Sequence, residues 1–280
     1  MKAYLVSHNG MGDNLYMVGA LNYLRPMYKH VYFLCKKRYY ENVKLFFDVS
    51  VNITCVPFND ELDECSGIAS ILKDKYTDEN NDIFICGTFH RRYMRSRINN
   101  KVVLAQHVTP NKYTLEWDTL TTTNYSFIED FYTSINLNLN HFYEYFDLPS
   151  VKESTDLYNT VNDYYIVFIQ TTSSQGTTLN ITNLCKKYMN DDKVILLCND
   201  TNLYDGETKD CEQTAIKHKL AQLFVMNKLT NYIDTIKNSD EIYLIDSCFV
   251  GIVLPLLKTG RLKTDKVRII TRSVAHKYEL

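Results

Sequence analysis

The sequence predicts an α/β chain of two Rossmann-like domains, residues 1–150 and 151–280. Short apolar runs of strand length alternate with segments of helical periodicity, a pattern typical of parallel sheets with right-handed crossovers. This alternation begins at 2–6, pauses over a polar stretch at 149–162 and starts again at 164–169. A chain of 280 residues also suits two domains of about 130 residues each.

The first domain contains five predicted strands and four predicted helices. The strands are expected at 2–6, 30–35, 51–56, 82–87 and 101–106. The first helix follows a turn and is stopped by Pro26, and the others are expected over 36–47, 60–76 and 125–146. The last has a helix-period apolar stripe that we expect to pack as core, namely Phe127, Ile128, Phe131, Ile135, Leu139, Phe142, Tyr143 and Phe146.

The second domain repeats the pattern on a smaller scale. Strands are predicted at 164–169, 193–198, 223–226 and 267–271, with helices at 181–188 and 211–223. The segment 228–249 is interpreted as helix, turn and strand, after which Asp246 and Ser247 open a helix that runs to Leu257.

Composition excludes several classes of protein. A net charge of -2 argues against general nucleic-acid binding. The eight cysteines form no Cys-x-x-Cys pair, and several, such as Cys35 and Cys198, lie in apolar runs, so we expect free buried thiols, no zinc site and no disulfide framework. No stretch reaches the roughly 18 apolar residues of a membrane span, and the N-terminus enters a strand without a signal peptide. We therefore expect a cytoplasmic protein.

A glycine-containing turn at 7–14 joins the first strand to the first helix. Strand, turn and helix start form the geometry in which α/β sheets present ligand groups at the carboxyl ends of their strands. We expect Gly10 and Gly12 to take positive φ and to let the backbone approach a ligand. Asp13 falls at or near the N-cap, where it either caps the helix or faces a crevice. The turn lacks the third glycine of a dinucleotide fingerprint.

The neighbours of Asp13 favour a functional turn over a simple cap, because a cap needs one acceptor only. His8 joins Asp13 as a catalytic candidate. Asn9 and Asn14 are expected on the acceptor side, and Gly12 is expected beside the donor.

The stretch Gly12-Asp13-Asn14-Leu15, followed by an apolar helix with Ala20 to Arg25 and then Tyr28, resembles the opening of the heptosyltransferase-like glycosyltransferases of GT-B fold. The resemblance implies two domains facing an interdomain cleft, with the acceptor held by the N-terminal domain and the donor by the C-terminal domain. It also implies that Asp13 is the base that takes the proton of the acceptor hydroxyl.

The run from His90 to Arg97 holds four arginines. It is either a solvated helix face or, because it follows a predicted strand, a border of the same crevice as Asp13. Guanidinium groups suit phosphate oxygens, carboxylates and vicinal hydroxyls. His90, Arg91 and Arg92 are accordingly expected to contact the acceptor.

Two segments of the second domain are candidates for donor binding. The hydroxyl-rich loop 170–178 precedes a helix and is suited to hold phosphate, although such loops are also common flexible connectors. The segment 228–249 again resembles the heptosyltransferase-like family, whose Asp-Ser/Thr pair lies at the donor diphosphate. The expected donor-binding residues are Gln170, Thr171, Thr172, Ser173, Ser174, Asn199, Lys228, Leu229, Asp246, Ser247 and Cys248.

The family pattern continues with a glycine and a histidine after the Asp-Ser/Thr pair. Here Phe249, Val250 and Gly251 stand instead, which leaves the sugar and the nucleotide undecided. The abundance of Tyr, Asn and Lys resembles glycosyltransferases of large algal or amoebal DNA viruses, which build capsid glycans. From that resemblance alone, a pentose or deoxyhexose donor such as UDP-xylose is expected.

These observations predict an inverting glycosyl transfer from a nucleotide sugar to a glycan hydroxyl, with Asp13 as general base. Because the sequence lacks an Asp-x-Asp pair, we expect no catalytic metal, and we expect no cofactor. The alternatives are a non-catalytic nucleotide- or sugar-binding protein, an epimerase and a methyltransferase. Against an epimerase, the sequence has no Tyr-x-x-x-Lys beside a full glycine fingerprint, and against a methyltransferase, the duplicated halves are unexpected.

Overall fold

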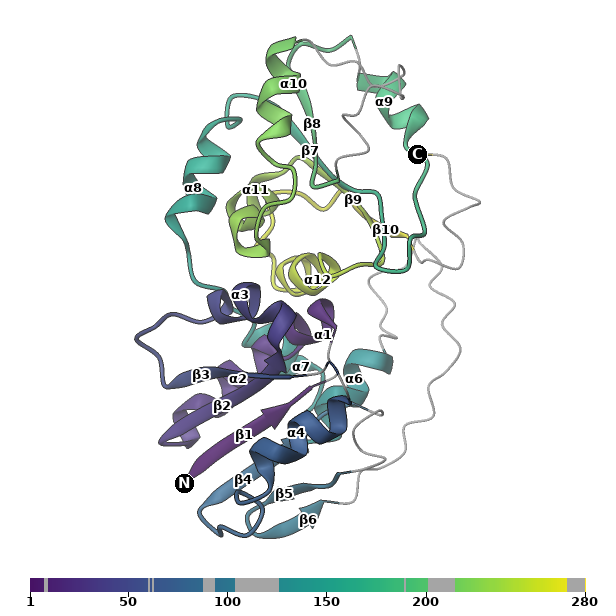
Figure 1. Ribbon diagram of the computed structural model, residues 1–280. Helices are drawn as coiled ribbons and strands as arrows, with labels where there is room; N and C mark the ends of the chain where they lie inside the picture. Colours follow the sequence, from purple (N-terminus) through teal and green to yellow (C-terminus); the bar gives the residue numbers. More distant parts are fainter. Residues whose placement is uncertain are drawn as a thin grey trace. The chain divides into compact units, whose positions relative to one another are not determined.

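The computed structural model describes residues 1–7, 10–59, 61, 63–87, 94–103, 126–188, 190–200, 215–270 and 280, and every structural statement below concerns these residues (Figure 1). The chain divides into two compact units. The described residues up to Pro149 form the first unit, and those from Ser150 on form the second. Each unit has its own sheet and its own core, and each is described by itself.

The first unit contains a six-stranded sheet in the order β3-β2-β1-β4-β5-β6. Its strands are β1 (Lys2–Val6), β2 (His30–Lys36), β3 (Ile53–Phe58), β4 (Asn81–Ile85), β5 (Ser96–Ile98) and β6 (Lys101–Val103). The first four are parallel, and the register places Val6 beside Leu34 and Ile85. The carboxyl ends of β2, β1 and β4 therefore meet at one edge, the carboxyl edge of the first sheet.

The helices of the first unit follow the βα alternation. They are α1 (Met11–Tyr16), α2 (Val18–Leu24), η1 (Arg25–Met27), η2 (Lys37–Tyr39), α3 (Tyr40–Val43), η3 (Lys44–Phe46), α4 (Glu64–Leu72), α6 (Ser126–Thr133) and α7 (Asn140–Glu144). Helix α4 buries Ile68 and Leu72 in one cluster with Val6 and Ile85. This burial fixes α4 over β1 and β4, since a crossover helix must cover the apolar face of the sheet it spans.

Two close contacts attach α6 and α7 to the helices that follow the N-terminal turn. The buried Tyr132 hydroxyl donates to the Tyr16 carbonyl at 2.7 Å and accepts from the Ala20 N–H at 3.1 Å. A Cβ at Gly19 would lie 2.5 Å from the His141 carbonyl oxygen, so glycine is what lets α2 approach α7. These contacts hold α1 and α2 in place behind the turn.

The second unit contains a parallel four-stranded sheet in the order β10-β9-β7-β8. Its strands are β7 (Tyr165–Gln170), β8 (Val194–Cys198), β9 (Glu241–Ile245) and β10 (Val267–Ile270). Its helices are α8 (Lys152–Asn159), α9 (Thr182–Tyr188), α10 (Ala215–Gln222), η7 (Leu229–Tyr232), α11 (Ile233–Asn238) and α12 (Val250–Lys258). Strands β7, β8 and β9 are buried along most of their length, as expected for a parallel sheet covered on both faces.

Different side chains cover the two faces of the second sheet. On one face, Leu184 and Cys185 of α9 join a cluster with Val167 and Ile169 of β7. On the other, Phe168 contacts Tyr232 and Phe249 at ring-centroid distances of 5.8 and 5.4 Å, in edge-to-face geometry. The aromatic contacts fix η7 and the start of α12 against the sheet.

A buried carboxylate lies at the amino end of β9. Glu241 accepts hydrogen bonds from the hydroxyls of Tyr165 at 2.9 Å and Tyr243 at 2.7 Å, and its carboxylate lies 3.5 Å from the Lys266 ammonium. Burial alone would raise the pKa of Glu241, but the tyrosine hydroxyls and lysines around it outweigh that effect and hold its pKa below the ordinary value. The group is thus a structural anion of the second sheet.

Several expected elements differ from the observed ones. The single helix expected over 125–146 is wrong, because Asn136 takes a φ of 60° and separates α6 from α7. The strand expected at 223–226 is wrong, because this segment turns through Met226 at a φ of 56°. Asparagine tolerates the left-handed region, which apolar periodicity does not reveal.

Other differences arise from short or polar segments. The strand expected at 101–106 is paired as β6 with an unpredicted β5, an antiparallel hairpin that turns through Asn99 and Asn100. The polar stretch 149–162 contains α8, whose buried Ser154 accepts a hydrogen bond from the Asp234 N–H at 2.9 Å. Tertiary contacts with α11 thus stabilise a helix that its own composition does not indicate.

Of the seven cysteines in the described part of the chain, six are free and Cys185 is not. Burial raises the pKa of the Cys35 thiol to about 12 and that of Cys198 to about 11, so these thiols stay protonated. Cys185 is disulfide-bonded, however, which makes the expectation of free thiols throughout wrong at this residue. No helix in the described ranges combines the length and apolarity that a membrane crossing requires.

Candidate functional site

The N-terminal turn places Asp13 in the first turn of α1. The Gly10 N–H donates to Asp13 Oδ2 at 2.8 Å, an arrangement of the capping-box type. Gly10 itself is the N-cap, with φ -76° and ψ 160°. The expectation that Gly10 and Gly12 take positive φ is therefore wrong: Gly10 is extended and Gly12 lies inside α1, because the helix begins earlier than the sequence indicates.

Glycine at position 10 serves a steric purpose instead. A Cβ there would lie 2.7 Å from Asp13 Oδ2 and 3.3 Å from its Cγ. The bare Cα lets the carboxylate fold back onto the Gly10 N–H. One oxygen of a partly exposed carboxylate is thereby held in a fixed direction at the carboxyl edge of the first sheet.

Asn14 supports the same turn from the other side. Its side chain is 1% exposed, and its Nδ2 donates to the Gly10 carbonyl at 2.7 Å. Its Oδ1 has no hydrogen-bond partner in the described structure. Asn14, expected to bind the acceptor, is thus built into the turn and keeps one unused acceptor atom.

Other expected residues of the first domain are not brought into this site by the described structure. His8, Asn9, His90, Arg91 and Arg92 lie outside the described residues. Arg97 closes the arginine run, and its guanidinium donates to the carbonyls of Lys75 at 3.2 Å and Asn81 at 2.8 Å, as well as to that of Asp78. Arg97 is therefore a structural residue of the β4–β5 hairpin and not a ligand-binding group.

In the second unit, expected donor-binding residues gather where three parallel strands end. The register pairs Ile169 of β7 with Cys198 of β8, and Gln170 of β7 with Leu244 of β9. Residues 170–172, 199–200 and 246–248 therefore lie at or directly after neighbouring strand ends. We call this row the donor edge. Loops at the carboxyl ends of parallel strands are where α/β proteins bind ligands.

The segment between α10 and η7 also reaches the donor edge. The Met226 N–H donates to the Asn199 carbonyl at 3.1 Å, which brings the following residues beside β8. Lys228 there is exposed, whereas Leu229 and Thr230 are buried. Lys228 can therefore present its ammonium to a ligand, while Leu229 packs into the protein.

The donor edge concentrates hydrogen-bonding atoms that are buried without a protein partner. Eight such side-chain atoms occur in the described part of the chain. Three belong to Asn14, Arg97 and Thr235, and Thr230 Oγ1 lies in η7. The other four lie at the donor edge: Gln170 Oε1, Thr172 Oγ1, Asn199 Oδ1 and Ser247 Oγ. A buried polar atom without a partner costs about 1–3 kcal/mol, so such a concentration indicates a place where a polar ligand supplies the partners.

The hydroxyl-rich loop is a tight turn, not an open cradle. Ser173 Oγ accepts from the N–H groups of Gln175 at 3.3 Å and Thr177 at 3.2 Å, and Gly176 has a φ of 77°. The loop then returns to the sheet before α9 begins at Thr182. Ser173 is thus occupied within the turn, and Ser174 is exposed on its outside.

Sequence reasoning missed one residue of the donor edge. Asp200 directly follows Asn199, and its Oδ2 accepts a 2.6 Å hydrogen bond from Thr171 Oγ1 across the ends of β7 and β8. The hydrogen bond fixes a carboxylate at the edge, where hydroxyl groups of a sugar are suitable donors to it. The strand-end position of Asp200 was the only signal in the sequence.

The end of β9 leads into α12 as the sequence indicates, with a short turn between them. The Asp246 N–H donates to the Ile270 carbonyl at 2.8 Å, and Val250 N–H donates to the Ser247 carbonyl at 3.1 Å. Ser247 and Cys248 are half-buried in this turn, while Phe249 is fully buried. Among the residues that the structure describes, no group of three His, Cys, Asp or Glu side chains is arranged to hold a metal ion.

Comparison with known proteins finds likeness in structure alone. No protein-family model matches the sequence, and no curated protein matches it significantly. The structure of ADP-heptose LPS heptosyltransferase II from E. coli is similar with a TM-score of 0.54 and 10% identity, over 96% of this chain and 90% of that one. A glycosyl transferase family 9 protein from Veillonella parvula is similar with a TM-score of 0.53 and 10% identity, over 90% of this chain and 77% of that one. The chain therefore has the α/β fold of these GT-B glycosyltransferases, which confirms the fold predicted from its sequence.

Proposed function

We propose that the chain is a glycosyltransferase that moves a sugar from a nucleotide-sugar donor to a hydroxyl group of a glycan. The observation that carries this proposal is the concentration of four unpartnered buried polar atoms at the donor edge. A fold similar to that of two glycosyltransferases supports the same reaction class.

The chemistry of the donor edge suits a nucleoside diphosphate sugar. The hydroxyls of Thr172 and Ser247 are donors for phosphate oxygens or acceptors for sugar hydroxyls. The amide oxygens of Gln170 and Asn199 accept from hydroxyl or base N–H groups. The exposed Lys228 ammonium supplies positive charge against the diphosphate, where charge develops as the leaving group departs.

We propose Asp13 as the general base on the acceptor side. Its carboxylate, oriented by the Gly10 N–H, takes the proton of the acceptor hydroxyl while that oxygen attacks the anomeric carbon. Attack from the face opposite the leaving diphosphate inverts the configuration at that carbon. General-base assistance is typically worth about 10²- to 10⁴-fold in rate. The reaction as proposed requires no metal.

The donor sugar is proposed to be a pentose or deoxyhexose carried by a uridine or guanosine diphosphate, with UDP-xylose as the first to test. Phe249, Val250 and Gly251 stand where the heptosyltransferase-like pattern has its histidine. The absence of a histidine here argues for a donor other than that of the heptosyltransferase-like family.

Thermal shift with UDP, GDP, ADP, UDP-xylose and S-adenosylmethionine tests the proposal. A ligand at 100 times its dissociation constant adds about 2.7 kcal/mol of stability, which is readily detected as a higher Tm. Stabilisation by a nucleoside diphosphate or its sugar is expected. Stabilisation by S-adenosylmethionine alone, or by none of the five, would overturn the proposal.

A matched pair of variants locates the binding. Ser247→Ala removes an unpartnered hydroxyl at the donor edge, whereas Thr235→Val removes an unpartnered buried hydroxyl in the middle of α11. Ser247→Ala is expected to weaken nucleotide binding by about 1–3 kcal/mol, and Thr235→Val is expected to leave it unchanged. Release of free UDP from UDP-xylose in the presence of a glycan acceptor then separates an enzyme from a binding protein.

A further inference from the structure

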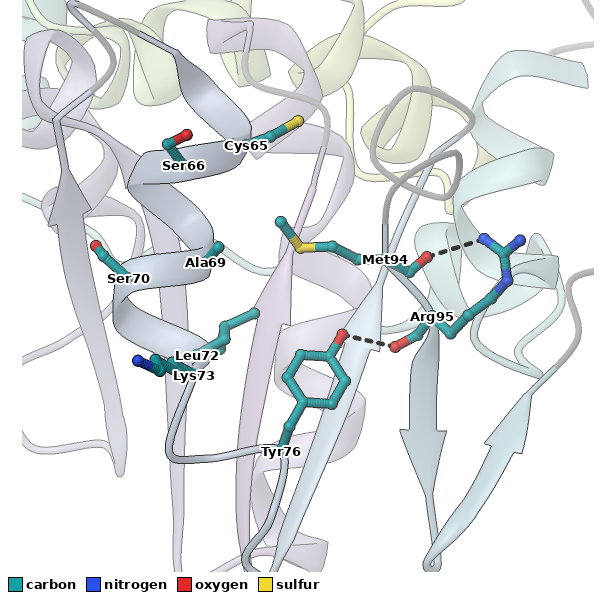
Figure 2. A pocket seen from close by; sticks show the side chains of 9 residues that line it. All are labelled: Cys65, Ser66, Ala69, Ser70, Leu72, Lys73, Tyr76, Met94 and Arg95. Carbon is teal, nitrogen blue, oxygen red and sulfur yellow. Dashed lines mark hydrogen bonds between the residues drawn. The ribbon is translucent and has the colours of Figure 1, made fainter.

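A pocket of about 710 Å³ lies beside α4 in the first unit, and Figure 2 shows the side chains that line it. The charged side chains among them, Lys73 and Arg95, point away from the space between α4 and Met94, and the Arg95 guanidinium donates to the Met94 carbonyl at 3.2 Å. None of the lining residues has a buried side-chain N or O atom without a partner. In the described part of the first unit, such atoms belong to Asn14 and Arg97. Because Arg97 is already held by backbone carbonyls, Asn14 is the residue whose unpartnered atom calls for an explanation.

The Asn14 amide carries a cost that an apolar side chain of similar size would avoid. Its side chain is 1% exposed, its Nδ2 donates to the Gly10 carbonyl at 2.7 Å, and its Oδ1 has no partner. Rotation of the amide by half a turn would bring Oδ1 against the Gly10 carbonyl oxygen, so it offers no remedy. A leucine would bury no such atom, and the Gly10 carbonyl would keep the bond from the residue 14 backbone N–H at 3.2 Å. The amide therefore has a role other than stability.

The residue that the Asn14 amide holds is the one that orients Asp13. The Gly10 N–H donates to Asp13 Oδ2 at 2.8 Å, and the carboxylate lies there because residue 10 has no Cβ to displace it. The same lack of a Cβ gives a glycine more backbone freedom than other residues have. Gly10 thus needs a restraint from outside if it is to hold the carboxylate in one direction, and the bond from Asn14 Nδ2 supplies it.

We propose that Asn14 is a positioning residue for Asp13. Its amide clamps the Gly10 carbonyl, the clamped Gly10 presents its N–H in one direction, and that N–H holds the Asp13 carboxylate toward the acceptor hydroxyl. Asn14 acts through these two residues, because a side chain that is 1% exposed does not reach a substrate. The part of Asp13 as base rests on the proposed function, whereas the clamp on Gly10 does not.

Amide hydrogen exchange measures the clamp without any substrate. The chain has nine glycines, so labelling with ¹⁵N-glycine gives a small set of NMR signals, among which Gly10→Ala identifies that of Gly10. In Asn14→Leu the Gly10 N–H is expected to exchange about two- to ten-fold faster, the factor that corresponds to the net strength of one hydrogen bond. Unchanged exchange would refute the clamp.

The same variant separates positioning from stability. Leucine removes the bond to Gly10 together with the unpartnered Oδ1, so the Tm of Asn14→Leu is expected to equal or exceed that of the unsubstituted chain. With UDP-xylose as donor and 4-nitrophenyl β-D-glucoside as acceptor, kcat is expected to fall about ten-fold at unchanged KM, since misplacing a reacting group by about 1 Å costs up to about 10²-fold in rate. A normal kcat, or a kcat that falls only in step with a lower Tm, would overturn the proposal.

Asn238→Leu is the matched control. The Asn238 Nδ2 also donates to the carbonyl four residues before it, that of Asp234, at 2.7 Å. Asn238 ends α11 just before β9 begins, at the opposite end of the second sheet from the donor edge. This variant is expected to lower Tm, since it removes a hydrogen bond and no unpartnered atom, and to leave kcat and the exchange of Gly10 unchanged. An equal loss of kcat in both variants would show a general effect and refute a role of Asn14 in positioning.

The two measurements also separate this proposal from the proposed function. Normal transfer by Asp13→Ala removes the base and with it the positioning role, although faster exchange of Gly10 in Asn14→Leu still establishes the clamp. Transfer that is lost in Asp13→Ala and normal in Asn14→Leu keeps the base and removes the positioning role. If the unsubstituted chain transfers no xylose, the proposed donor is wrong, and the exchange of Gly10 alone decides on the clamp.

Discussion

Substitution of Gly10 by alanine tests whether Asp13 is the general base. The backbone at Gly10 has φ -76° and ψ 160°, a region open to alanine, so the substitution creates no backbone strain. The added Cβ would lie 2.7 Å from Asp13 Oδ2, whereas ordinary contact begins at 3.4 Å. The carboxylate oxygen must therefore retreat by about 0.7 Å, the difference between those two distances.

The expected cost follows from that displacement. Retreat weakens or breaks the Gly10 N–H···Oδ2 bond, a capping interaction whose loss destabilises by about 1 kcal/mol. A misplacement of about 1 Å in a reacting group costs up to about 10²-fold in rate, so kcat is expected to fall by about ten- to a hundred-fold. Nucleotide affinity is expected to stay constant, since Asp13 belongs to the acceptor side of the reaction.

A double-mutant cycle makes the test specific. Transfer is measured for Gly10→Ala, Asp13→Ala and the double variant, with the nucleotide sugar that stabilises the chain, and Tm is measured for each. If Gly10 acts through Asp13, the double variant is no slower than Asp13→Ala alone. Additive losses would refute the steric argument, and normal transfer by Asp13→Ala would refute the base.

Three further predictions concern the scaffold. Gly19→Ala is expected to destabilise the chain by about 1–3 kcal/mol through overpacking against His141, seen as a lower Tm, and an unchanged Tm would contradict the close approach. Tyr132→Phe removes the hydroxyl that bonds the Tyr16 carbonyl and the Ala20 N–H. It is expected to lower the free energy of unfolding, measured with denaturant, by about 1–3 kcal/mol, and an unchanged free energy would contradict this. Glu241→Gln is expected to lower stability at pH 7. Because the pKa of Glu241 is lowered in the folded chain, that loss should shrink as the pH falls below about 4.5, and a loss that persists in acid would refute the assignment.

The alternation of strands and helices was predictable because burial imposes it. Strands of a parallel sheet are apolar on both faces, so runs such as 83–85 and 194–198 are recognisable without any knowledge of their partners. Their order was not predictable in detail. The position of β1 between β2 and β4, and of β7 between β9 and β8, depends on which crossovers pack, a property of the assembled core.

Errors arose where one residue's conformation overrides the pattern around it. Apolar side chains continue at helical spacing through 125–146, yet Asn136 adopts a left-handed conformation and splits the helix. The helix α8 was missed for the opposite reason. Its sequence is polar, and the hydrogen bond between Ser154 and the Asp234 backbone, which helps to hold it, joins residues far apart in the chain.

The candidate site was predictable as a set of positions and not as a set of contacts. Strand ends and adjacent hydroxyl or amide residues identified Gln170, Asn199 and Ser247. Whether a side-chain oxygen has a hydrogen-bond partner depends on the surrounding backbone. The Ser247 hydroxyl has no partner, whereas the Ser173 hydroxyl accepts from N–H groups of its own turn, and the sequence did not distinguish the two. The 2.6 Å hydrogen bond from Thr171 to Asp200 joins the ends of two strands and could not be predicted from the sequence either.

The surroundings of the arginine run depend on a strand reversal that its charge concealed. On a solvated helix after β4, Arg95 and Arg97 would have had equivalent surroundings. Because β5 instead pairs antiparallel with β4, the Arg97 guanidinium donates to the carbonyls of Lys75 and Asn81, whereas the Arg95 guanidinium donates to the Met94 carbonyl at 3.2 Å. Arg97→Ala is therefore expected to destabilise the chain by about 1–3 kcal/mol, seen as a lower Tm. An unchanged Tm in that variant would show that these hydrogen bonds do not stabilise the chain.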